Sequence, residues 1–195
     1  MFASCTAAMA AVTALSIDPS AVFAADSTGS SVPLAEFKDP DCKFSIQMPT
    51  SWNASTQSLP DRRKIQLYID PNSNQKTLVF IAYTPVRDDF TSLGSFGSVD
   101  QVAQTTILPK GEIAGAEGVS ATMLSAESKK NCYFFDYKQT VPNQPETHFR
   151  TIFTLINGAT GGAGGVLVTI TAQTPESNYA AMKPVFDQII DSYSK

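Results

Sequence analysis

Residues 44–53 read FSIQMPTSWN, and this stretch guides the interpretation of the whole chain. Phe44, Ile46 and Met48 alternate with two polar residues, which is the two-residue period of a strand with one buried face. Pro49 then interrupts the alternation, and Trp52, the only tryptophan, follows at once. The stretch therefore predicts a short half-buried strand that ends at a proline.

Six further strands are predicted downstream, and their connections are short and turn-like. Such spacing favours an antiparallel meander over βαβ units, whose crossovers need about a dozen residues or more. The predicted strands cover residues 64–69, 77–84, 119–125, 132–140, 148–156 and 166–172.

Two helices are predicted to interrupt the strands. Ser98 followed by Gln101 fits a capping box that opens a helix from Val99 to about Ile107, with Val102 and its neighbour facing inward. Near the end of the chain, apolar residues at helical spacing predict a helix with a buried stripe, in which Pro184 should cause a kink or a restart. That stripe comprises Tyr179, Met182, Phe186, Ile189, Ile190 and Tyr193. The expected class is α+β, a sheet with helices packed on its faces.

Composition and length predict one folded domain. The 195 residues are 43% hydrophobic and 16% charged, which is sufficient for a sizeable core. Residues 1–24 are rich in alanine and contain no Lys or Arg, so we interpret them as a cleaved targeting segment that is incomplete at its start. Residues 25–35 are expected to be a flexible lead-in, and residues 36–195 the folded domain. The glycine-rich run 158–165 is expected to be a hairpin loop and not a phosphate cradle, because a strand and not a helix follows it.

The charge balance argues against a nucleic-acid partner. The formal net charge is −4, and it becomes −3 when removal of residues 1–24 takes away one acid, Asp18, and no base. Two local basic clusters remain, at Arg62, Arg63 and Lys64 and at Lys129 and Lys130. They could dock on an acidic protein surface in a salt-sensitive manner, or be ordinary solvated loops and strand ends.

Two cysteines, Cys42 and Cys132, remain after the first 24 residues are removed. An even number fits a disulfide that would close a loop of roughly 90 residues. Two separate thiols are equally compatible with the spacing, because the sequence does not show how close the two Cα atoms lie.

The sequence offers little for catalysis. His148 is the only histidine, and no G-x-S-x-G nucleophile elbow is present. A catalytic metal site usually takes three protein ligands, which one histidine and scattered carboxylates do not indicate. We therefore expect a protein that binds rather than catalyses; the alternative from another class is a small hydrolase or metal enzyme that depends on His148.

Four blocks, in the same order along the chain, resemble the PsbP family of extrinsic photosystem II proteins. They are CKFSIQMPTSWNAS at 42–55, YIDP and FTSLGSFGSV within 68–99, the strand pair within 121–156, and residues 171–194 with an A-Q-x-x-E turn and a helix that ends in D-S-Y. The resemblance implies an α-β-α sandwich around a central antiparallel sheet.

The resemblance also implies a location and a role. It implies a protein of the chloroplast thylakoid lumen, held at the membrane through protein contacts with photosystem II lumenal subunits and other extrinsic proteins. There it would support the oxygen-evolving complex by calcium and chloride retention, without catalysis. The alternative is a PsbP-like assembly factor for photosystem I or II. Residues 25–38 are shorter and less basic than the N-terminal extension of plant PsbP proteins, which favours that alternative.

One candidate ion site follows from the resemblance. In some members of the family, a histidine at a strand start and a carboxylate in the A-Q-x-x-D turn bind a divalent ion. The matching residues here are His148 and Glu176. They would bind calcium, manganese or zinc weakly, or else form a surface hydrogen bond to each other; no tightly bound cofactor is expected.

Overall fold

The structure, a computed structural model, describes residues 32–108, 119–157 and 165–195. The predicted targeting segment, the predicted lead-in up to residue 31, and all but the last residue of the glycine-rich run lie outside the described residues. In the described ranges, no helix has the length and hydropathy needed to cross a membrane.

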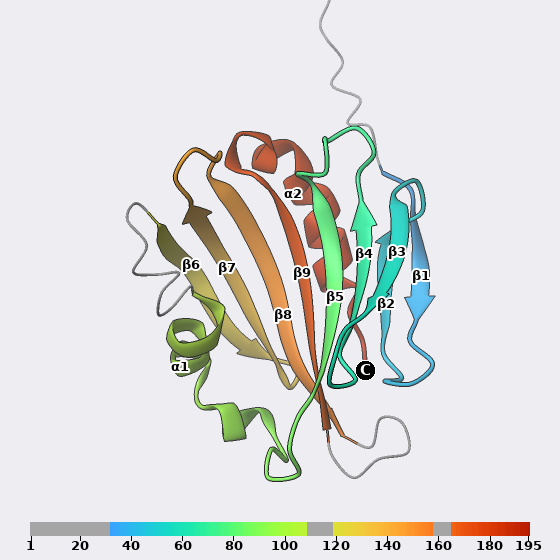
Figure 1. The fold of residues 1–195 in the computed structure, drawn as a ribbon, viewed down its shortest axis with the longest axis vertical. Coiled ribbons are helices and arrows are strands. Elements are labelled where there is room, and N and C mark those ends of the chain that lie inside the picture. Colours follow the sequence, from blue (N-terminus) through green and yellow to red (C-terminus); the bar gives the residue numbers. More distant parts are fainter. Residues whose placement is uncertain (1–31, 109–118, 158–164) are drawn as a thin grey trace, which may run out of the picture.

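The described residues form nine strands, and seven of them make one antiparallel sheet in the order β3-β4-β5-β9-β8-β7-β6. The remaining two, β1 and β2, pair as a separate antiparallel hairpin. The predicted α+β class with a large antiparallel sheet is confirmed (Figure 1). The strands are β1 (Leu34–Lys38), β2 (Ser45–Pro49), β3 (Asn53–Ser58), β4 (Lys64–Ile69), β5 (Leu78–Pro85), β6 (Ser120–Lys129), β7 (Cys132–Thr140), β8 (Thr147–Asn157) and β9 (Gly165–Pro175).

The predicted first helix begins where the capping box places it. The Ser98 N–H donates to Gln101 Oε1 at 2.8 Å, and the Gln101 N–H donates to Ser98 Oγ at 3.3 Å. The helix continues as α1 (Val99–Val102) and then widens into the π-helical turn η2 (Ala103–Ile107); a 3-10 turn, η1 (Leu93–Phe96), precedes it.

The C-terminal helix, α2 (Glu176–Asp191), runs without interruption past Pro184. The sequence allowed for the helix to stop and restart at this proline, and this does not happen. Val185 and Phe186, directly after the proline, are buried against the sheet, so packing holds the helix together where one backbone hydrogen bond is missing.

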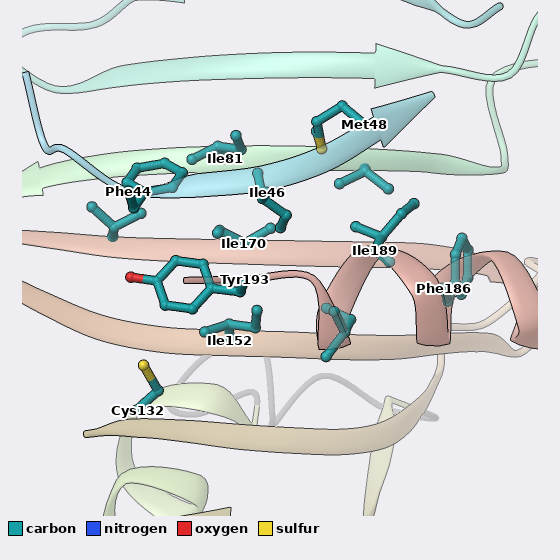
Figure 2. Close-up of a cluster of buried hydrophobic side chains, with 14 of the residues drawn as sticks. Phe44, Ile46, Met48, Ile81, Cys132, Ile152, Ile170, Phe186, Ile189 and Tyr193 are labelled. Atoms are coloured by element: carbon teal, nitrogen blue, oxygen red, sulfur yellow. The ribbon is translucent and has the colours of Figure 1, made fainter. Parts of the chain in front are cut away.

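One face of the sheet carries α2 and the β1–β2 hairpin. Inward-facing residues of β5, β8 and β9 meet Phe186 and Ile189 of α2 and Tyr193 just after it, while Phe44 and Ile46, at the start of β2, close the same cluster (Figure 2). This packing explains the opening stretch of the sequence, because its alternating apolar residues are all buried. The last residues are tied to the same hairpin by a bridge between Ser45 and Ser194.

The opposite face carries the η1–α1–η2 segment, but only over part of the sheet. Val102 and Ala103 are buried there, as predicted, against aromatic residues of β7 and β8. Tyr133 of β7 fixes the segment by donating its hydroxyl to the Gly97 carbonyl at 2.9 Å. The helices therefore lie on both faces, which is the layering that the family resemblance implied.

Two strands were not predicted. β1 begins at Leu34, so the last two residues of the predicted lead-in belong to a strand. β3 reads NASTQS and is exposed along its whole length. It lies at the edge of the sheet, with one neighbouring strand and no contact with the core. Its side chains therefore need no alternation of apolar and polar residues, and the sequence shows none.

Candidate functional site

His148 and Glu176, the predicted ion ligands, are brought together where β8 and α2 begin. His148 lies opposite Lys138 of β7 and Thr174 of β9, on the face that carries α2. Glu176 opens α2, and its N–H donates to the Glu146 carbonyl at 2.8 Å. That bond ties the start of the helix to the chain just before β8.

His148 is buried between two carboxylates. Its exposed fraction is 2%; Nδ1 lies 2.6 Å from Glu176 Oε2, and Nε2 lies 2.6 Å from Asp136 Oδ1. The ring of Tyr179 stacks on the imidazole, with 3.3 Å between the centroids and 9° between the planes. Both ring nitrogens are thus committed to hydrogen bonds with carboxylates, so neither is free to take a proton from a substrate.

The two carboxylates connect to further charges of alternating sign. Lys138 Nζ lies 2.6 Å from Glu176 Oε1. On the other side, Arg150 Nε lies 3.6 Å from Asp136 Oδ2, and the same guanidinium also contacts Asp187 of α2. The result is a chain of ion pairs that joins β7 and β8 to the helix above them.

The carboxyl groups at both ends of this chain are stabilised in their charged form. Burial alone would raise their pKa values. Hydrogen bonds from Lys138 and the imidazole nevertheless lower the pKa of Glu176 below its usual range. Bonds from Lys183 and Arg150 do the same for the pKa of Asp187.

This geometry does not fit a divalent ion. A zinc or manganese ion would need a free imidazole nitrogen about 2.0–2.1 Å away, but carboxylate oxygens already occupy both sides of the His148 ring. Lys138 places a positive charge on the second oxygen of Glu176, where it would repel a cation. Among the described residues, no group of three or more His, Cys, Asp or Glu side chains is arranged to hold a metal. The hydrogen-bond alternative is the observed one, although the histidine is buried and not at the surface.

The partners of His148 were missed by the sequence analysis. Asp136 and Tyr179 contact the imidazole itself, whereas Lys138, Arg150 and Asp187 extend the network through Glu176 and Asp136. The sequence did contain a sign of this network. In the predicted strands 132–140 and 148–156, Asp136 and Arg150 alternate in step with the apolar residues that face α2. Because cross-strand pairing alone decides which charges meet, the register was needed to find them.

The two predicted basic clusters lie at the same end of the sheet but at opposite edges. Arg62, Arg63 and Lys64 lie in and after the β3–β4 turn, whereas Lys129 and Lys130 end β6 and begin the turn into β7. β4 and β7 run in the same direction in this antiparallel sheet, so both turns point to one end, with β5, β9 and β8 between them.

Several of these cations already have partners. Arg63 lies 3.7 Å from Asp61, and Lys129 lies 3.5 Å from Glu127. Lys64 Nζ sits over the ring of Tyr83, 4.1 Å from its centroid. Arg62 and Lys130 form no ion pair with the described residues, and both have positive φ angles, 60° and 52°, at turn tips.

Cys42 and Cys132 are both buried in the core beneath α2, and both are free thiols. The disulfide that the sequence left open is therefore not formed in this structure. Burial raises the pKa of Cys42 to about 11, and burial likewise raises the pKa of Cys132. At neutral pH both behave as small apolar residues of the core.

Comparisons with known proteins agree with the architecture. The family model described as PsbP matches residues 33–195. The chain belongs to the PsbP family. The match begins one residue before β1 and includes every described strand and helix of the domain.

Two relatives of this PsbP-family chain are informative. It is 26% identical over 173 residues to PsbP domain-containing protein 3, chloroplastic, of Arabidopsis thaliana, covering 85% of this chain and 66% of that protein. The chain thus spans just under two thirds of the length of that relative. The solution structure of cyanobacterial PsbP (CyanoP) from Synechocystis sp. PCC 6803 matches with a TM-score of 0.59 at 16% identity, covering 84% of this chain and 92% of the other. At this identity the second match concerns the fold alone.

Proposed function

We propose that this chain is a PsbP-like protein of the chloroplast thylakoid lumen that binds at the lumenal side of photosystem II and supports the oxygen-evolving complex. Its membership of the PsbP family over residues 33–195 carries the proposal. The chloroplastic relative supports the compartment.

Binding, and not catalysis, is the proposed activity. The only histidine has both ring nitrogens engaged by carboxylates and one ring face covered by Tyr179, so it is a poor general base. The basic end of the sheet offers instead a means of docking. Arg62 and Lys130 are exposed cations in turns whose backbone is fixed by hairpin geometry, and an acidic lumenal surface would attract them.

The test is rebinding of residues 25–195 to salt-washed photosystem II membranes, with oxygen evolution followed at limiting calcium and chloride. We expect saturable binding that restores activity and weakens as salt rises. The double variant Arg62→Gln/Lys130→Gln should bind several-fold more weakly at low salt. Lys183→Gln, which removes one cation from α2 instead, should bind like the wild type. Absence of binding to membranes from the same organism would refute the proposal.

A second candidate is an assembly factor that binds photosystem I or II intermediates transiently. It is favoured by the match to a PsbP domain-containing protein. Fractionation of native membranes separates the two functions. An extrinsic subunit co-migrates with mature photosystem II, whereas an assembly factor is found only with immature complexes.

A further inference from the structure

β4 turns three of its four apolar side chains away from the core beneath α2, although the fourth, Tyr68, packs on that core. An antiparallel sheet normally turns its apolar side chains to the core and its polar ones to solvent. In β4, Lys64 and Gln66 point to the face that carries α2 and the hairpin, whereas Ile65, Leu67 and Ile69 point to the opposite face.

The register extends this arrangement into a ladder across two strands. Ile65 pairs with Ala82, Leu67 with Phe80, and Ile69 with Leu78 of β5, so six apolar side chains stand in three cross-strand pairs. We call these six residues the apolar ladder. All six are partly exposed, and none belongs to either hydrophobic core of the described residues. The η1–α1–η2 segment covers the same face only farther along, over β6 to β8.

The strand positions that flank the apolar ladder on this face carry no charge. β3 presents Asn53, Ser55 and Gln57 to this face, and β9 presents residues such as Thr169 and Gln173. No ionisable side chain points to this face from β3, β4, β5 or β9. An apolar centre with a neutral hydrogen-bonding rim has the composition of a protein–protein interface.

One end of the apolar ladder opens into a groove of about 420 Å³ between the β4–β5 and β7–β8 turns. The groove is lined mainly by uncharged residues, among them Gln173, the cross-strand neighbour of Leu78. Its only charge is the exposed Lys76, which forms no ion pair with any described residue. A carboxylate of another molecule could form an ion pair with Lys76 at this end of the surface.

We propose that the apolar ladder is a docking surface for a protein partner that presents a flat, uncharged, apolar surface and a carboxylate for Lys76. The proposal deepens the binding role proposed above and rests on it. Lipid is a worse occupant, because this face has neither the basic rim nor the tryptophan that a membrane interface favours. A second copy is also worse, because the same face supplies no carboxylate to meet Lys76.

The ladder runs from Ile65, next to the basic cluster of the β3–β4 turn, to the groove at the other end of the sheet, and the two docking contributions differ in their response to salt. Binding through Arg62 and Lys130 is screened by salt, whereas burial of the apolar ladder is not weakened by salt. The two turns that border the groove lie at the opposite end of the sheet from the basic clusters.

The test uses the full chain from residue 25 and photosystem II membranes of the same organism, with affinity measured by co-sedimentation at low and high salt. Leu67→Thr/Phe80→Thr keeps β-propensity but removes the centre of the apolar ladder. We expect it to weaken binding at least tenfold at both salt concentrations, with far-UV circular dichroism unchanged. Lys76→Gln should weaken binding about threefold at low salt only. The matched control is Leu124→Thr, at an apolar side chain 49% exposed on β6, which should leave affinity unchanged.

The possible failures are separable. If the wild type binds and Leu67→Thr/Phe80→Thr binds equally well, the apolar ladder is not the docking surface, although the proposed function stands. If the wild type does not bind, the proposed function fails and this inference falls with it. A dimer in sedimentation velocity that the double variant dissociates would make a second copy the occupant. Equal binding to protein-free vesicles of thylakoid lipids would make lipid the occupant, and either result overturns the protein partner.

Discussion

Replacing His148 tests whether the buried ion-pair chain stabilises the fold. The imidazole forms two hydrogen bonds to charged groups, at 2.6 Å each, and each such bond contributes about 1.5–3 kcal/mol. Asp136 and Glu176 retain 24% and 29% side-chain exposure, so water partly replaces the lost donors and the lower value applies. Stacking on Tyr179 adds roughly 0.5–1 kcal/mol. We expect His148→Ala to lower the free energy of unfolding by about 3.5–4 kcal/mol.

Urea and thermal unfolding followed by circular dichroism measure this loss. For a domain of this size, about 3.5–4 kcal/mol corresponds to a fall in Tm of about 7–16 °C. His148→Phe keeps an aromatic ring but has neither nitrogen, so it should lose most of the same stability. Thr147→Ala, one residue earlier and on the other face of β8, is the control and should cost less than about 1 kcal/mol. Wild-type stability in His148→Phe would refute the reasoning, because it would mean that packing alone accounts for the site.

Four further predictions concern other parts of the described structure. Because the pKa of Glu176 is lowered in the folded protein, its contribution is present above its ordinary pKa of 4.5 and is lost as pH falls below that value; Glu176→Gln should flatten the acid limb of a stability–pH curve. Cys42 and Cys132 should react with a thiol reagent at pH 8 only after urea unfolding, and fast labelling of the native protein would contradict their burial. Gly97→Ala should cost about 1–3 kcal/mol in urea unfolding, because φ is 112° and a Cβ would meet the capping glutamine at 2.8 Å, whereas Ser98→Ala should cost about 1 kcal/mol. Calcium or zinc at millimolar concentration should leave the Tm of the EDTA-treated protein unchanged, and a rise of several degrees would show that an ion can displace the hydrogen bonds.

The elements that carry a strong periodic signal were predictable from the sequence. β7 was predicted with its observed bounds, and the capping box placed the first helix turn, because both depend on neighbours within a few residues. β3 was not predictable from its own residues. Its polar run forms a strand only because the backbone groups of β4 are available for hydrogen bonding beside it. The predicted helix after Ser98 was correct at its start, but its π-helical second half was not foreseen.

The candidate site was predictable only in part. The meeting of His148 and Glu176 followed from the family resemblance and is confirmed at 2.6 Å. The second carboxylate, Asp136, comes from another strand, and no local pattern says which residues of β7 and β8 face each other. The apolar ladder was equally hidden, because residues 64–69 were recognised as a strand while the face on which Leu67 lies depends on what packs against it.

The bridge between Ser45 and Ser194 has a consequence for the timing of folding. It joins the second strand to a residue synthesised 149 positions later, and Tyr193 beside it fills the same core. Contacts this distant in sequence form late, because a long loop must close first. The nascent chain therefore cannot complete its core until Tyr193 and Ser194 have left the ribosome. A foreign segment inserted directly after Lys195, whose Nζ donates to the Leu155 carbonyl at 2.8 Å, should therefore slow this last folding step, whereas one inserted before the first strand should not.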